Sequence, residues 1–188
     1  ADGWTSRPLP VPALPVDALS RDLGRLAAAW YGEPSRALLS VGVTGTNGKT
    51  SCSQWIAQAF NAAGRKCAVI GTLGMGFPDA LAPNPNTTPD AIVLQKGLRQ
   101  FVDAGAQAVA MEVSSIGLDQ GRVNGTRFRV ALFTNLSRDH LDYHRDMEAY
   151  GEAKAKLFRM PGLAHGVLNL DDAFGVRLAQ SLTGSTVE

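Results

Sequence analysis

The run Val41-Gly-Val-Thr-Gly-Thr-Asn-Gly-Lys-Thr50 contains the residue types that bind a polyphosphate. Glycines such as Gly45 and Gly48 let backbone N–H groups approach phosphate oxygens closely, and the start of a helix adds a positive dipole end. A lysine such as Lys49 can reach the outer phosphates, and the hydroxyl of Thr50 can hold Mg²⁺. We therefore expect a nucleoside triphosphate to bind at this loop.

The loop departs from the usual P-loop spacing, which places a glycine five residues before Gly48. Val43 occupies that position, and Gly42 lies one place away from it. Because Gly-Lys-Thr alone often occurs by chance, a glycine-rich turn without a ligand is the alternative. A strand-like apolar segment at 38–43 precedes the loop and a helical pattern at 49–63 follows it, and this context favours phosphate binding.

Apolar strand-like segments alternate with amphipathic helical segments along most of the chain. This alternation predicts an α/β fold, a mostly parallel sheet with helices on both faces. The predicted strands are 38–43, 67–71, 107–113, 129–135 and 165–170. The predicted helices are 49–63, 89–104, 146–159 and 172–182. Thr88 and Pro89 suit the N-cap and the first position of the second of these helices.

The first 37 residues differ in pattern from the rest. Residues 1–15 contain four prolines and are typical of a linker or docking arm. A helix is expected to begin near Asp17, and its apolar face is expected to pack into the core through Leu19, Leu23, Leu26 and Trp30. We assign 1–37 to an interdomain segment and 38–188 to a nucleotide-binding domain.

Composition excludes several classes of protein. The chain has 188 residues, a net charge of +1 and a hydrophobic fraction of 45%. Nothing in this charge balance indicates a nucleic-acid or membrane surface, and no apolar run approaches the roughly 20 residues that span a bilayer. Two cysteines are too few for a disulfide framework, and no signal peptide is evident, so we expect a cytoplasmic monomer.

Polar clusters follow three of the predicted strands, at 44–50, 112–115 and 135–144. Ligands of such sheets bind beyond the carboxyl ends of the strands, so these clusters are expected to form one site. Glu112 ends an apolar strand and is either a metal ligand beside the phosphates or an acid exposed at the strand end. On pattern alone, Lys154 is a solvated helix lysine and each histidine of 135–144 is a loop residue.

The segment Asn86-Thr-Thr-Pro89 precedes a predicted helix. Its two hydroxyls and the free N–H groups of a helix start can form a site for an anion or a sugar diphosphate. A plain N-cap explains the same residues equally well.

Taken together, these motifs resemble the Mur ligases of bacterial cell-wall synthesis. The matching runs are Val43-Thr-Gly-Thr-Asn-Gly-Lys-Thr50, Asn86-Thr-Thr-Pro-Asp90, Met111-Glu-Val-Ser-Ser115, Leu118-Asp-Gln-Gly-Arg122, Asn135-Leu-Ser-Arg-Asp-His-Leu-Asp-Tyr-His144 and the helix Tyr150–Phe158. The resemblance extends from about Asp17 to the C-terminus. It implies the P-loop NTPase-like central domain of such a ligase, with ATP and Mg²⁺ as cofactors.

The resemblance also implies roles for individual residues. Thr50 and Glu112 resemble ligands of the ATP-bound Mg²⁺, and His140 resembles a ligand of a second Mg²⁺. Lys154 matches a lysine that the family carries as a carbamate, and catalysis is expected to use Lys49, Lys154 and His140. Residues expected to bind ATP are Gly45, Thr46, Asn47, Gly48, Lys49, Thr50 and Ser51. Residues expected to bind the UDP-muramoyl peptide are Asn86, Thr87, Thr88, Ser114, Gln120 and Arg122.

Within the family, the chain resembles members that add the third amino acid, meso-diaminopimelate or L-lysine, to UDP-N-acetylmuramoyl-L-alanyl-D-glutamate through an acyl phosphate. Sister Mur ligases, folylpolyglutamate synthetases and a non-catalytic nucleotide-binding module are the alternatives. Ile116 stands where family members often have histidine, so no imidazole role carries over there. The family's C-terminal domain is missing from the pattern, and we expect 188 residues alone to form no amide bond.

Overall fold

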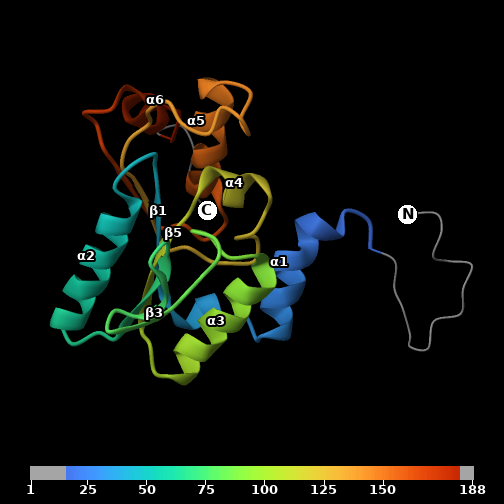
Figure 1. The fold of residues 1–188 in the computed structure, drawn as a ribbon, viewed down its shortest axis with the longest axis vertical. Coiled ribbons are helices and arrows are strands. Elements are labelled where there is room, and N and C mark those ends of the chain that lie inside the picture. The colour runs from blue at the N-terminus through green and yellow to red at the C-terminus, as the bar shows by residue number, and fades with distance from the viewer. Residues whose placement is uncertain (1–15, 183–188) are drawn as a thin grey trace, which may run out of the picture.

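A computed structural model describes residues 16–182 (Figure 1), and they form one seven-stranded sheet with strand order β4-β3-β2-β5-β1-β6-β7. Strands β2, β5, β1, β6 and β7 run parallel, whereas β3 pairs antiparallel with both β2 and β4. The strand bounds are β1 Leu39–Thr44, β2 Cys67–Gly71, β3 Gly74–Phe77, β4 Ala80–Ala82, β5 Ala108–Glu112, β6 Val130–Phe133 and β7 His165–Leu168.

Helices cover both faces of the sheet, as the sequence predicts. In Figure 1, α2 lies on one side of the sheet and α3, with α1 packed against it, on the other. The helix bounds are α1 Leu19–Trp30, η1 Pro34–Ala37, α2 Lys49–Ala62, α3 Ala91–Asp103, α4 Ser115–Asp119, α5 Met147–Ala155, η2 Lys156–Arg159 and α6 Ala173–Leu182. Within residues 16–182, no helix combines the length and apolarity needed to cross a bilayer.

All five predicted strands and four predicted helices are present, with ends displaced by at most two residues when α5 and η2 are taken as one helical segment. The sequence analysis missed the antiparallel hairpin β3–β4, which joins the sheet at β2. Gly74 and Gly76 occupy alternate positions of β3 and have no side chain to show the period-two pattern of a strand. The short helix α4, five residues long, was also missed.

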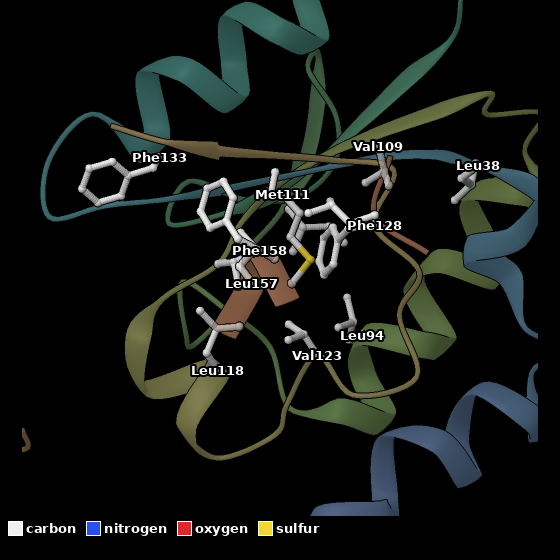
Figure 2. Close-up of a cluster of buried hydrophobic side chains, with 14 of the residues drawn as sticks. Leu38, Leu94, Val109, Met111, Leu118, Val123, Phe128, Phe133, Leu157 and Phe158 are labelled. Atoms are coloured by element: carbon white, nitrogen blue, oxygen red, sulfur yellow. The ribbon is translucent and has the colours of Figure 1, made fainter. Parts of the chain in front are cut away.

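The larger core fills the face of the sheet under α3 and η2 (Figure 2). Val109 and Met111 of β5 point into it, and Phe128 and Leu157 close it from the opposite side. A smaller cluster between α2 and the other face contains Ala57, Cys67, Val69, Ala108 and Ala110. Because both faces of β5 are buried, the acid that ends this strand is held in a rigid, dry position.

The predicted apolar face of the first helix is mostly wrong. Leu19 and Leu26 are each 49% exposed, Trp30 is 84% exposed, and only Leu23 is half-buried. The buried residues of α1 are small ones, Gly24, Ala27 and Ala28. A small-residue face allows the closest approach to α3 and to the turn at 121–126, so the helix docks through it. Its N-cap is Ala18, without a side-chain hydrogen bond, and not Asp17.

The predicted N-cap of the helix after Asn86-Thr-Thr-Pro89 is also wrong. Asp90 caps α3, and its Oδ1 accepts hydrogen bonds from the backbone N–H groups of Ile92 and Val93, each 3.0 Å long. Aspartate is as good an N-cap as threonine and adds a charge that favours the positive helix end. Thr88 is thereby free for other contacts.

We expect Asp90→Ala to lower the free energy of unfolding by about 1 kcal/mol, because two N–H groups of α3 lose their acceptor. Asp103→Ala is the matched control at the other end of the same helix. Its carboxylate forms only an exposed pair with Arg99 and contributes at most about 0.5 kcal/mol. Urea unfolding curves of both variants check this, and equal losses would contradict the cap assignment.

Candidate active site

The loop after β1 has the strained geometry of a phosphate cradle. Gly45 has φ +142°, and a Cβ there would lie 1.9 Å from the Thr134 hydroxyl oxygen, so only glycine fits. The segment after β6 braces the loop: the Thr46 N–H donates to the carbonyl of Asn135 (2.8 Å), and the Asn47 N–H donates to the Asn135 side chain (3.1 Å). The loop is therefore held in place by its neighbouring strand before any ligand binds.

Two lysines converge on this loop. The Nζ atoms of Lys49 and Lys154 donate to the same acceptor, the carbonyl oxygen of Gly45, at 2.9 and 2.8 Å. Lys49 also donates to the carbonyl of Thr46 at 2.7 Å. The sequence pattern made Lys154 a solvated lysine, but it is 1% exposed, and its ammonium lies 4.2 Å from the centre of the Tyr150 ring. The pattern-based interpretation of this residue is wrong.

The electrostatics of the two amines follow from this arrangement. Burial, and then the neighbouring charge of Lys49, lower the pKa of Lys154 to about 7. Burial also lowers the pKa of Lys49, against the opposing effect of the Glu112 carboxylate. At pH 7 the neutral amine is therefore far more abundant at Lys154 than in a free lysine, where it is about one in 2,500. A neutral amine is the form that reacts with CO₂.

Glu112 and Thr50 form the second part of the site. The Glu112 carboxylate is 1% exposed and accepts hydrogen bonds from the Thr50 hydroxyl (3.0 Å), the Thr72 N–H (2.8 Å) and the Thr72 hydroxyl (3.3 Å). No ion pair to Glu112 occurs within the described residues. A buried carboxylate beside a hydroxyl is an oxygen donor set that suits Mg²⁺, so these residues fit the expected metal. The exposed-acid interpretation of Glu112 is excluded by its burial.

His140 lies at the edge of this group. Its side chain is 46% exposed, and its ring centre lies 6.1 Å from that of Tyr150, the ring on which Lys154 rests. Its backbone has φ +49°, an uncommon conformation for histidine. Within residues 16–182, no set of three or more His, Cys, Asp and Glu side chains is close enough to hold a metal. His140 and Lys154 therefore share one neighbour, the Tyr150 ring.

The six residues expected to bind the muramoyl peptide lie around the carboxyl end of β5. Thr88 is 1% exposed, its hydroxyl donates to the carbonyl of Glu112 and lies 3.1 Å from the Ser114 hydroxyl, and the Arg122 guanidinium donates to the carbonyl of Thr88 at 2.9 Å. Gln120 accepts from Arg122, and the Thr87 hydroxyl lies 3.0 Å from that of Thr72. Asn86 is exposed and accepts a hydrogen bond from Asn84 through its carbonyl. Gln120, Arg122 and Asp90 line a cleft of about 820 Å³.

Several residues of the site were missed by the sequence analysis. Thr72 follows strand β2 at the same sheet edge as the other clusters, and that position was the available signal. Tyr150 was quoted only as part of a matching run, yet it is 1% exposed and its hydroxyl lies 3.3 Å from the Thr46 hydroxyl. Thr134 was also missed; with Asn135 and Ser137 of the predicted 135–144 cluster it braces the loop through contacts that sequence spacing does not predict.

Comparisons with known proteins identify the family of the chain. The Mur ligase middle domain matches residues 43–188. The chain belongs to the Mur ligase family. The family resemblance inferred from the motifs is thereby confirmed, together with the fold.

Among Mur ligases, the similar curated relatives are named UDP-N-acetylmuramoyl-L-alanyl-D-glutamate–2,6-diaminopimelate ligase. The protein from Ralstonia nicotianae is 62% identical over 92% of this chain and 34% of its own length. The protein from Pseudomonas aeruginosa is 58% identical over 92% of this chain and 35% of its own length. The chain thus spans about a third of the length of these relatives.

Solved structures give the same grouping. A structure of a ligase with the same name is 40% identical, with a TM-score of 0.81 over 90% of this chain and 34% of that chain. E. coli FolC in complex with ADP is 22% identical, with a TM-score of 0.64 over 89% of this chain and 46% of that chain. The second likeness shows a shared fold alone.

Proposed function

We propose that the protein containing this chain is an ATP-dependent ligase of peptidoglycan precursor synthesis. It joins 2,6-diaminopimelate to the D-glutamyl end of UDP-N-acetylmuramoyl-L-alanyl-D-glutamate and releases ADP and phosphate. The names of the relatives favour diaminopimelate over L-lysine. Both the nucleotide and the UDP-linked acceptor are cytoplasmic metabolites, which places the reaction in the cytoplasm.

One observation carries this proposal: a phosphate loop holds two lysines on one carbonyl oxygen, beside a buried Thr50–Glu112 pair. Such a site can bring two anions together. In the first half-reaction a carboxylate oxygen of the acceptor attacks the γ-phosphoryl group of ATP, giving an acyl phosphate and ADP. The amine of the incoming amino acid then displaces phosphate, forming the amide and releasing a proton.

This chain's own residues supply position and charge. The loop 45–51 binds the triphosphate through the Lys49 ammonium and through backbone N–H groups other than those of Thr46 and Asn47, which donate to Asn135. Thr50 and Glu112 would hold Mg²⁺, which neutralises phosphate charge when it is bound. We assign His140 to a second Mg²⁺; its ring lies 6.1 Å from that of Tyr150, which Lys154 also contacts, and this supports the assignment.

We assign a carbamate to Lys154. The reaction is addition of CO₂ to the neutral amine with loss of one proton, which replaces a buried cation by an anionic oxygen ligand. The pKa of the Lys154 amine, about 7, makes the neutral, reactive amine abundant. The adjacent Lys49 cation favours an anionic carbamate at Lys154. Arg122 and Gln120 bind the muramoyl peptide in the cleft that they line, and Thr87 contacts it from the neighbouring segment, which the Arg122–Thr88 hydrogen bond holds in place.

The proposal is tested by measuring ADP release from the full-length gene product with each UDP-muramoyl precursor and each candidate amino acid. We expect turnover only with UDP-N-acetylmuramoyl-L-alanyl-D-glutamate and diaminopimelate. Lys49→Met is expected to lower kcat by on the order of 10²–10³, as loss of one charge-stabilising donor does. Lys66→Met, an exposed lysine beside Phe77, is the matched control. Turnover with a folate or with D-glutamate as the added amino acid would identify a sister enzyme.

A further inference from the structure

Thr72 contacts both parts of the site: Glu112, where the nucleotide is expected to bind, and Thr87, where the UDP-muramoyl dipeptide is expected to bind. It follows β2, in the two-residue turn before β3, and its side chain is exposed at the sheet edge. We propose that Thr72 is a positioning residue that links two binding events. It couples binding of the UDP-muramoyl dipeptide at Thr87 to the position of the Glu112 carboxylate, and through this carboxylate to binding of the Mg²⁺ nucleotide. This inference rests on the function proposed above.

The first contact fixes the carboxylate. The Thr72 N–H donates to Oε1 of Glu112 at 2.8 Å, and the Thr72 hydroxyl donates to Oε2 at 3.3 Å, so one residue contacts both oxygens. The approach needs glycine at the preceding position, because a Cβ on Gly71 would lie 2.1 Å from Oε1. The end of β2 is therefore shaped around the Glu112 carboxylate.

The second contact is with Thr87. The Thr72 hydroxyl also lies 3.0 Å from the hydroxyl of Thr87, in the segment expected to contact the muramoyl peptide. A hydroxyl has one proton to donate and two lone pairs to accept with. Because the carboxylate only accepts, the proton of Thr72 points to Glu112, and Thr87 must donate to Thr72. The relay therefore has one direction, Thr87 to Thr72 to Glu112.

This relay makes the two ligands interdependent. The Thr72–Glu112 hydroxyl contact, at 3.3 Å, is longer than the usual 2.7–2.8 Å of such bonds, so it is weak in this structure and can tighten. When a group of the bound muramoyl peptide donates a hydrogen bond to the Thr87 oxygen, it polarises the relay. The hydrogen bond from the Thr72 hydroxyl to Oε2 of Glu112 then becomes stronger. Oε2 is also the oxygen bonded to Thr50, so the effect reaches the pair that would hold Mg²⁺.

Thr88 forms a second link between the same segments, but of another kind. Its hydroxyl bonds the backbone carbonyl of Glu112 and the Ser114 side chain, and not the carboxylate. Thr88 is fully buried, so its replacement would disturb the fold. Thr72 is exposed, and its replacement tests the relay without opening the core.

The test measures binding and not turnover, in the full-length gene product. The dissociation constant of Mg²⁺ with a non-hydrolysable ATP analogue is measured by calorimetry, with and without saturating UDP-N-acetylmuramoyl-L-alanyl-D-glutamate. The ratio of the two constants is the coupling factor, which we expect to be at least about fivefold in the wild type. Thr72→Val keeps the size and the N–H but loses the hydroxyl, and the factor is expected to fall to about one. Thr72→Ser is expected to restore it.

Two further variants sharpen the result. Thr87→Val removes the other end of the relay, and in the Thr72→Val background it should have no additional effect on the factor. Leu73→Ala, an exposed neighbour, should leave the factor unchanged. A wild-type factor of one, or an undiminished factor in Thr72→Val, would overturn the inference while leaving the proposed function intact. Wild-type protein that binds neither ligand would overturn both.

Discussion

Replacing Lys154 with methionine is expected to change the pH dependence of stability and to abolish most of the ligase activity. The folded-state pKa of about 7 lies below the unfolded value of 10.5, because burial disfavours the ammonium. Between these values the unfolded chain holds a proton that the folded chain has lost. The folded protein therefore gains stability as pH rises, and the cost of the buried charge is fully present only below pH 7.

The measurement is the free energy of unfolding of the 188-residue chain in CO₂-free buffer from pH 6 to 10. The wild type should gain stability relative to Lys154→Met with a slope approaching about 1.4 kcal/mol per pH unit above pH 7. Lys156→Met removes a half-exposed lysine two residues further along and should keep the wild-type slope. Parallel curves for wild type and Lys154→Met would show that folding does not lower the pKa of Lys154.

The same variant tests the carbamate in the full-length gene product. Methionine fills the space of the lysine but cannot add CO₂, so kcat is expected to fall by on the order of 10²–10³. Wild-type protein should show a labile mass increase of about 44 Da, the mass of one CO₂, that Lys154→Met lacks. Full activity of Lys154→Met would remove the amine from the mechanism.

The sequence predicted the parallel sheet well because its strands are buried on both faces. Val69, Val109 and Ala110 lie in continuous apolar runs, and such runs leave few alternatives to a buried strand. The phosphate loop was equally accessible, since glycine, lysine and threonine must be close in sequence to act on one phosphate group. A single sequence therefore predicts best those sites whose residues lie close together along the chain.

The sequence predicted α1 and Lys154 poorly for a shared physical reason. In both cases the sequence shows on which face of a helix a residue lies. Its burial, however, depends on contacts with segments far away in the chain. The leucines of α1 resembled a core face, yet Ala27 and Ala28 form the contact because they permit closer packing. Lys154 resembled a solvated lysine, yet its amine donates a hydrogen bond to the carbonyl of Gly45, more than a hundred residues earlier.

The contacts of Thr72 and Thr88 illustrate the same limit at the site. The motif Asn86-Thr-Thr-Pro89 identified both threonines at 87–88, but their partners depend on how β2 and β5 align. Pairing of Ile70 with Met111 sets the end of β2 beside Glu112. The residue type at Thr72 does not predict these contacts; they depend on the register of β2 and β5.

Glu112→Gln is expected to separate metal binding from folding. Glutamine has the shape of glutamate and can keep the same three contacts, because the hydroxyls of Thr50 and Thr72 can accept from its amide while the Thr72 N–H donates to its carbonyl. The free energy of unfolding without metal should therefore stay within about 1 kcal/mol of wild type, since a buried charge without an ion pair is also removed.

Binding should respond in the opposite way. An amide is a neutral and weaker ligand than a carboxylate, so we expect the affinity for Mn²⁺ in the presence of ADP, followed by electron paramagnetic resonance, to fall at least about 100-fold. Glu148→Gln, which removes a mostly exposed carboxylate from α5, should bind Mn²⁺ as the wild type does. Unchanged Mn²⁺ affinity in Glu112→Gln would mean that the buried carboxylate serves only to hold Thr50 and Thr72. Lost affinity with an intact fold would place the metal at this carboxylate, because no structural defect could then account for the loss.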